Sequence, residues 1–331
     1  MPDAAYAAIA IINQEPTLAI LFIIIALLWL SYSNGANDNF KGVATLYGSG
    51  GASYKGALLW ASLTTAAGCL VSVFFAENLI KVFNGRGLVP GEMLGAPELL
   101  IAVGIGAALT IFIATLLGMP TSTTHALLGA LLGIIVAGAF IGQADWPAFA
   151  RPFAAPLLLS PLIAIALAAL FYPAARFARR KICITPETCV CIGNAPSETA
   201  HLQPDGSLVP ASTGLTLTVA QADACIQRYQ GSLVGVSAQT LVNATYFLST
   251  SPVCFSHALN DTPKIAALLL AAKALGINPS MDFGAVALAM CAGGLINSRR
   301  VAETMSKKIT ALNAGVGLIA NLVTAFLVLF A

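Results

Sequence analysis

The chain has 331 residues, of which 58% are hydrophobic and only 9% are charged, and its mean hydropathy is +0.85. Because soluble domains typically carry about 25% charged residues, this composition excludes an ordinary water-soluble globular protein and indicates an integral protein of the lipid bilayer. The formal net charge of +2 gives no sign of a nucleic-acid partner.

Apolar stretches long enough to span a membrane recur along the chain, since a spanning helix needs about 20 apolar residues. They lie at 17–33, 54–76, 97–118, 153–175, 236–257, 281–298 and 309–331. No Lys or Arg precedes Lys41, so the first stretch lacks the basic region of a signal peptide and is predicted to be retained. Shorter apolar stretches at 124–142 and 262–276 follow polar motifs and are predicted to be half-helices or re-entrant segments.

A polar segment separates two predicted membrane halves, 1–175 and 236–331. Residues 176–235 are interpreted as a cytoplasmic linker or small subdomain, because placing the basic clusters 176–181 and 298–308 in the cytoplasm gives a consistent threading with the N-terminus outside. No metal site is predicted for this segment, because the spacing of its cysteines is not a standard zinc pattern. Free thiols in a reducing cytosol, or disulfides if the segment faces outside, are the alternatives. The side chains concerned are Cys183, Cys189, Cys191, Cys225 and His201.

One polar motif occurs in both halves. "GANDNFKG" contains Asn37, Asp38 and Lys41, and "ALNDTPKI" contains Asn260, Asp261 and Lys264 with the same spacing. The threading runs the spans that carry the two motifs in opposite directions. This pattern predicts an all-α membrane protein of two inverted-topology repeats with broken or re-entrant helices, the architecture of many secondary transporters.

The residue types of this motif suit an ion site. Asn and Asp cap helix N-termini, where free N–H groups and the helix dipole favour an anion. The Asp38 and Asp261 carboxylates also offer oxygen ligands to a small cation or a proton. Lys41 and Lys264 add positive charge one turn later. The alternative is a pair of surface caps with snorkelling lysines, but a costly intramembrane charge that recurs in both halves favours a shared site.

A third motif, "GMPTSTTHALLG" (118–129), follows the span at 97–118. Pro120 is predicted to end that helix, and the next residues offer hydroxyl and N–H donors to an oxyanion at the start of a new helix. An ordinary Ser/Thr cap with a core histidine at His125 is the alternative.

The predicted site therefore has three groups of residues. The anion ligands are Asn37, Asp38, Ser122, Thr123, Thr124, Asn260 and Asp261. The coupling-ion ligands are Asn37, Asp38, Asn260 and Asp261. Lys41 and Lys264 balance charge, and His125 and His257 are proton-sensitive neighbours.

These three motifs resemble the G-A-N-D and P-x-S-T-T-H motifs of the inorganic phosphate transporter (PiT) family, in the same order and across both halves. The resemblance implies uptake of inorganic phosphate, coupled to sodium ions or protons, by a multi-pass homodimer of the plasma or inner membrane. It also implies that the N-D motifs and the S-T-T segment line the anion and cation sites. No cofactor other than the coupling Na⁺ or H⁺ is expected.

The sequence departs from the family pattern in two places. Lys41 and Lys264 stand where relatives commonly have Asn, and an ammonium group there could fill the space of a sodium ion or contact the anion, which favours proton coupling. A second P-x-S-T-T segment is also missing before Ala331, which leads us to expect a truncated chain.

Other functions remain open at this stage. A sulfate permease of the same family would use a similar tetrahedral oxyanion. An intramembrane hydrolase would need Ser122 or Thr123 with His125 or His257 as base, but the chain lacks G-x-S-x-G and the duplicated motif would be unexplained. A passive channel would use the same groups to line a pore. We predict a transporter rather than an enzyme.

Overall fold

The structure is a computed structural model that divides into two compact units, Met1–Ala168 with Leu248–Ala331, and Ala169–Phe247. The residues that the structure describes are 16–83, 96–137, 146–149, 155–181, 188–202, 208–221, 223–224, 227, 233–271, 279–310 and 314–330.

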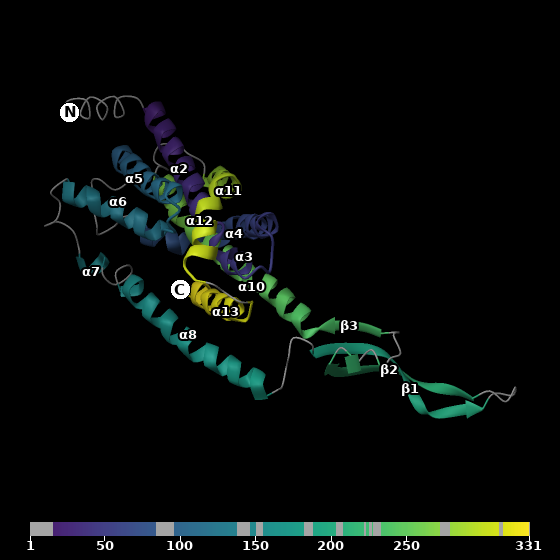
Figure 1. The fold of residues 1–331 in the computed structure, drawn as a ribbon. Helices are drawn as coiled ribbons and strands as arrows, with labels where there is room; N and C mark the ends of the chain where they lie inside the picture. The colour runs from purple at the N-terminus through teal and green to yellow at the C-terminus, as the bar shows by residue number, and fades with distance from the viewer. Residues whose placement is uncertain are drawn as a thin grey trace. The chain divides into compact units, whose positions relative to one another are not determined.

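The first unit is built from helices (Figure 1). Its longer helices are α2 (Pro16–Asp38), α4 (Tyr54–Phe83), α5 (Pro97–Leu116), α6 (Thr123–Ala137), α11 (Pro279–Asn297) and α13 (Ala314–Phe330). Short elements join them: η1 (Lys41–Val43), α3 (Ala44–Gly48), α7 (Trp146–Phe149), α12 (Arg299–Glu303) and the π-helical turn η6 (Thr304–Lys308). Helices α8 (Ala155–Lys181) and α10 (Ala238–Ala271) each have residues in both units.

Apolar helices confirm a membrane protein. Within the described residues, four segments are long and apolar enough to cross a bilayer, namely Thr17–Gly48, Tyr54–Phe74, Pro97–Leu116 and Ala155–Ala178. Shorter apolar helices are Thr123–Ala137, Phe283–Asn297 and Gly315–Val328. Helices are therefore found at the predicted spans, and α6 covers the described part of the predicted short segment 124–142.

The prediction of a separate half-helix at 262–276 was wrong for the residues that the structure describes. Helix α10 runs without a break from Ala238 to Ala271 and contains Pro252 and Pro263, while 272–276 lie outside the described residues. Proline is tolerated inside membrane helices because neighbouring helices and Ser/Thr side chains satisfy the freed backbone groups. The first motif differs, because α2 ends at Asp38 and the chain turns before η1.

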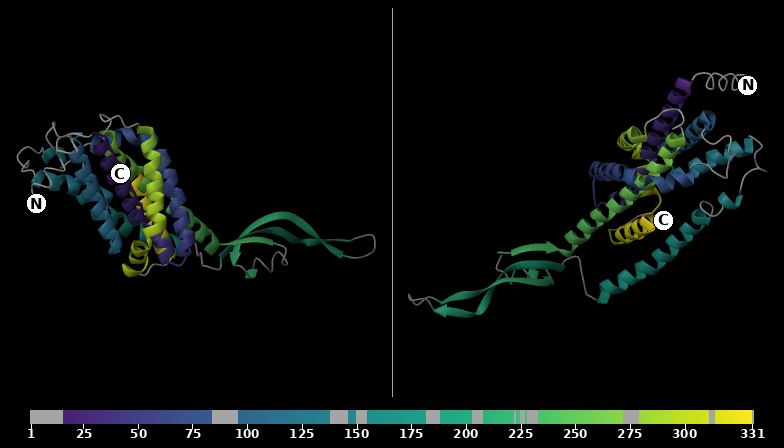
Figure 2. Two further views of the ribbon diagram at one scale, coloured as in Figure 1. Left: turned by 90° about the horizontal axis from the view of Figure 1, so that it is seen from above. Right: turned by 180° about the vertical axis from the view of Figure 1, so that it is seen from behind.

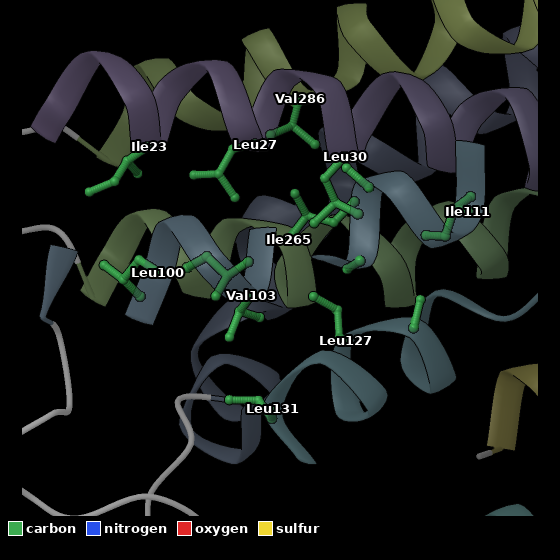
Figure 3. Packing of buried hydrophobic residues seen from close by; sticks show 14 of the residues in the cluster. Ile23, Leu27, Leu30, Leu100, Val103, Ile111, Leu127, Leu131, Ile265 and Val286 are labelled. Carbon is green, nitrogen blue, oxygen red and sulfur yellow. The ribbon is translucent and has the colours of Figure 1, made fainter. Parts of the chain in front are cut away.

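The core of the first unit lies between α2, α5, α6, α10 and α11. Figure 3 shows Leu27, Leu127, Ile265 and Val286, from four of these helices, among the packed side chains. Since lipid is as apolar as these side chains, close van der Waals packing rather than a hydrophobic driving force holds such helices together.

Two glycines let α2 and α11 meet backbone to backbone. A Cβ atom added at Gly35 would collide with the main chain of Met290, and one added at Gly293 would collide with the main chain of Tyr32. Small residues at a crossing permit this close approach in membrane proteins. Gly35 is the first residue of the G-A-N-D motif, so the motif is held directly against α11.

The second unit contains a three-stranded antiparallel sheet in the order β2-β1-β3 (Figure 2). Its strands are β1 (Thr188–Leu202), β2 (Leu208–Gln221) and β3 (Leu233–Ser237). Cys191 pairs with Thr218 on one side and with Gly235 on the other. The predicted division of the chain at residues 175 and 235 stays a prediction.

The cysteines of this unit give no metal cluster among the described residues. Cys189 is buried, and Cys191 is disulfide-bonded, so the Cys191 sulfur is not available as a zinc ligand. Cys183 and Cys225 lie outside the described residues, and His201 lies in β1.

The glycine contact between α2 and α11 yields the first testable prediction. Gly293→Ala should lower the free energy of unfolding by about 1–3 kcal/mol, because the added methyl overpacks a backbone contact. Gly284→Ala lies on the same helix with open space around its Cβ position, and should be neutral or stabilising by up to about 1 kcal/mol. Thermal unfolding of the purified protein in detergent measures both, and equal effects at the two positions would contradict the packing argument.

Candidate functional site

The structure brings all three sequence motifs to one place inside the first unit. The carboxylate oxygens of Asp38 and Asp261 and a ring nitrogen of His257 lie within 4.8 Å of one another. Asp38 is 7% exposed and Asp261 is 5% exposed. The two aspartates are therefore neither far apart nor at a surface, although their roles stay predictions.

Each aspartate pairs with the lysine three residues later. The Lys41 Nζ to Asp38 Oδ1 distance is 2.5 Å, and the Lys264 Nζ to Asp261 Oδ1 distance is 3.3 Å. All four side chains are at most 14% exposed. A buried ion pair of this kind leaves a costly bare charge if one partner is lost, so each lysine balances the charge of its aspartate in the bundle.

Both lysines also reach the start of α6, Lys41 just before the helix and Lys264 in its first turn. Lys41 Nζ donates a hydrogen bond to the main-chain oxygen of Thr121. Lys264 Nζ donates to Thr124 Oγ1 at 2.9 Å. The two repeated motifs therefore approach the same segment, each through an ammonium group.

The start of α6 supplies the helix N-terminus of the site. Gly118 adopts a left-handed conformation with φ +72° and closes the end of α5, after which Pro120 cannot extend that helix. The main-chain N–H of His125 bonds to Ser122 Oγ at 3.4 Å, so Ser122 caps the new helix. The first N–H groups of α6 have no partner within the helix and favour an anion.

The N-D motifs themselves do not lie at helix N-termini, so that part of the prediction was wrong. Asn37 and Asp38 occupy the last turn of α2, while Asn260 and Asp261 lie within the continuous helix α10. After Asp38 the chain turns into the short 3₁₀ helix η1, and α10 continues through Asp261. Among the described α-helices, α6 is the one whose start the two lysines contact.

Asn37 holds the third motif in position. Its Nδ2 donates to Thr115 Oγ1 and to the Met119 main-chain oxygen, each at 3.0 Å, and its Oδ1 accepts from the Thr121 N–H at 2.8 Å. Both amide N–H groups are thus used within the protein. Asn260 makes a related contact, with Nδ2 donating to the Val328 main-chain oxygen of α13 at 3.4 Å.

Thr123 connects the site to a residue that the sequence prediction missed. Its hydroxyl hydrogen-bonds to Asn34 Oδ1 and lies 3.3 Å from Asp261 Oδ2, and Asn34 Nδ2 lies 3.5 Å from the same oxygen. Asn34 precedes Asn37 by three residues, as His257 precedes Asn260. Extending the motif comparison by one turn would have found Asn34, whereas nothing in the sequence marks Thr115.

The same extension pairs two buried serines. Ser33 and Ser256 each precede the motif asparagine by four residues, they are 0% and 1% exposed, and within the described part of the chain neither hydroxyl has a hydrogen-bond partner. His125, in contrast, is exposed and lies outside the cluster of Asp38, His257 and Asp261.

Comparison with known proteins agrees with the three motifs. The family model described as the phosphate transporter family matches residues 34–331. A putative phosphate permease of Pyrococcus horikoshii is 28% identical over 151 residues, which are 44% of this chain and 36% of the relative. A probable low-affinity inorganic phosphate transporter of Streptomyces halstedii is 29% identical over 160 residues, 46% of this chain and 69% of the relative.

A solved structure has the same fold. It is described as "The sodium-dependent phosphate transporter", and it aligns with a TM-score of 0.64 and 18% identity over 95% of this chain and 84% of that chain. The chain spans well under half the length of several curated relatives, including 36% of the P. horikoshii permease and 30% of a putative phosphate permease of Helicobacter pylori.

These matches are transporters and permeases, which confirms the prediction that the chain is not an enzyme.

The buried ion pairs yield the second prediction. Asp261→Asn should lower the free energy of unfolding by about 3–5 kcal/mol, because it leaves the Lys264 ammonium buried without its carboxylate. The double variant Asp261→Asn/Lys264→Met removes both charges and should recover most of that loss. Denaturant unfolding in detergent measures both variants.

An exposed ion pair serves as the control. Arg299 and Glu303 are 76% and 42% exposed, so Glu303→Gln should change stability by only about 0–1 kcal/mol. Equal destabilisation by Asp261→Asn and by the double variant would show that the ion pair is not the cause.

Proposed function

Because this chain belongs to the phosphate transporter family, we propose that it carries inorganic phosphate across a lipid bilayer by alternating access. The transport cycle is driven by a gradient of sodium ions or protons and takes phosphate up into the cell. The proposal includes a multi-pass location in the plasma or inner membrane and a homodimeric assembly, both implied by the resemblance to this family.

One observation supports the proposal most strongly: the start of α6 meets two buried Asp–Lys pairs in the interior of an apolar helical bundle. An oxyanion that leaves water must exchange its hydration for fixed donors, because an unpaired charge in the membrane interior is costly. The α6 N–H groups, the threonine hydroxyls and the two ammonium groups are donors of the required kind.

The carboxylates favour phosphate over sulfate. Phosphate carries a proton at neutral pH and can donate a hydrogen bond, whereas sulfate only accepts. Asp38 and Asp261 offer acceptor oxygens next to the donors of α6. A sulfate ion has no proton to donate to these acceptor oxygens, so it would lie against them without a hydrogen bond, which costs free energy.

Alternating access fits a site at the meeting point of the two sequence halves. Asp38 and Asp261 belong to different halves and lie together with the start of α6. In secondary transporters, movement of one repeat against the other around such a midplane site exposes the solute to one side at a time. A passive channel would need an open path instead, and it could not concentrate its solute.

Transport by the purified full chain tests the proposal. Proteoliposomes should accumulate labelled phosphate above its outside concentration when a sodium or proton gradient is imposed, and excess sulfate should compete weakly. Uptake that only equilibrates would indicate a channel, and uptake of sulfate in preference to phosphate would indicate a sulfate permease.

Thr123→Val gives the third prediction. Removing the hydroxyl leaves the buried Asn34 Oδ1 without the donor that Thr123 supplies and takes one of the donors from Asp261, which costs about 1–3 kcal/mol, so phosphate uptake should fall about tenfold or more. The control is Thr110→Val, because Thr110 is exposed and its hydroxyl bonds to the Gly106 main-chain oxygen of its own helix. Similar loss in both variants would contradict a role for Thr123 in the site.

A further inference from the structure

The two lysines decide whether a sodium ion fits the site. Sodium is a hard cation, and such cations take oxygen ligands from carboxylates, carbonyls and hydroxyls. The N-D motifs offer such oxygens on the carboxylates of Asp38 and Asp261 and on the amides of Asn37 and Asn260, and the start of α6 offers others. Asn37 Oδ1 already accepts the Thr121 N–H. The question is whether these oxygens are open to a metal ion or already bound to a cation of the protein.

In the first motif the cation is Lys41. Its ammonium nitrogen lies 2.5 Å from Asp38 Oδ1 and also contacts the main-chain oxygen of Thr121. The ammonium thus has a carboxylate oxygen and a carbonyl oxygen as neighbours, which are ligands that a hard cation prefers.

The second motif repeats this arrangement with Lys264. Its ammonium nitrogen lies 3.3 Å from Asp261 Oδ1 and 2.9 Å from Thr124 Oγ1. A carboxylate oxygen and a hydroxyl oxygen again surround a positive charge. Both lysines therefore bridge an N-D motif and the Thr121–Thr124 segment.

A sodium ion at either carboxylate would be placed next to an ammonium group in a buried environment. Like charges repel most strongly where water does not screen them, and the two aspartates are already balanced by the two lysines. The residues of this chain therefore do not fit a sodium ion at these two motifs, although the solved structure with the same fold is described as sodium-dependent.

We propose that Lys41 and Lys264 are tethered cations that take the place of coupling sodium ions in this chain. The proposal rests on the proposed function and specifies its cation requirement. A tethered ammonium supplies positive charge for the anion but stays with the protein when the anion leaves. Phosphate binding is therefore independent of sodium, and a sodium gradient does not drive transport.

Direct sodium binding tests the proposal without any phosphate. The purified full chain in detergent should show no saturable binding of radioactive ²²Na⁺. Saturable binding by the unchanged chain would overturn the proposal, and this measurement needs no variant to fold.

Variants of the two lysines then test whether these side chains are the reason that sodium does not bind. Lys41→Asn/Lys264→Asn replaces each ammonium by an amide oxygen and should create saturable ²²Na⁺ binding. Lys55→Asn is the matched control, since Lys55 is exposed on α4 and should leave the protein without sodium binding. A double variant that elutes as a folded protein from size exclusion but binds no sodium would also overturn the proposal.

Phosphate binding, measured with and without sodium, separates failure of this proposal from failure of the proposed function. Replacing sodium by choline should change the affinity of the unchanged chain for labelled phosphate less than about twofold, whereas coupled ligands typically change each other's affinity by about 5- to 150-fold. A large sodium effect would overturn the proposal. Absence of phosphate binding in both buffers would instead overturn the proposed function, and the ²²Na⁺ arm would still decide whether the lysines exclude sodium.

Discussion

Two buried carboxylates in an apolar helical bundle depend on two lysines. Asp38 and Asp261 lie close enough to repel each other, and each is stabilised by the ammonium group one turn further along the chain. Ionised groups inside a membrane protein persist only when they are paired or hydrated. The local spacing of Asp and Lys therefore sets which charges the bundle can hold, and the remaining polar contacts are arranged around these pairs.

The backbone around the two ion pairs is not equivalent, although the pairs have the same spacing. Asp38 ends α2, and the chain then turns into η1, whereas Asp261 lies inside α10. Both lysines nevertheless reach the start of α6. The i,i+3 relation survives this difference because residues 38–41 stay locally helix-like, so that a single turn is enough to bring the ammonium to the carboxylate.

Sequence reasoning succeeded where the signal was local. The apolar spans followed from length and composition, and the repeated Asn-Asp-x-x-Lys motif pointed to residues that the structure brings together. It failed where a non-local contact or a tertiary environment decided the outcome. The bonds of Asn37 to Thr115 and Met119 join residues far apart in the sequence, and no pattern in either segment marks them. The polar motif at the start of 262–276 also misled the assignment of that segment as a half-helix, because α10 continues through the motif and membrane helices with close neighbours tolerate its prolines.

The glycine contact between α2 and α11 restricts how the two halves of the chain can move. Gly35 and Tyr32 belong to the first half, and Met290 and Gly293 belong to the second. Because main chain touches main chain there, the helices cannot approach further, and sliding would drive neighbouring side chains into each other. The crossing can still act as a pivot, so that a rocking motion would change distances far from it while the start of the G-A-N-D motif stays at an almost constant separation from α11.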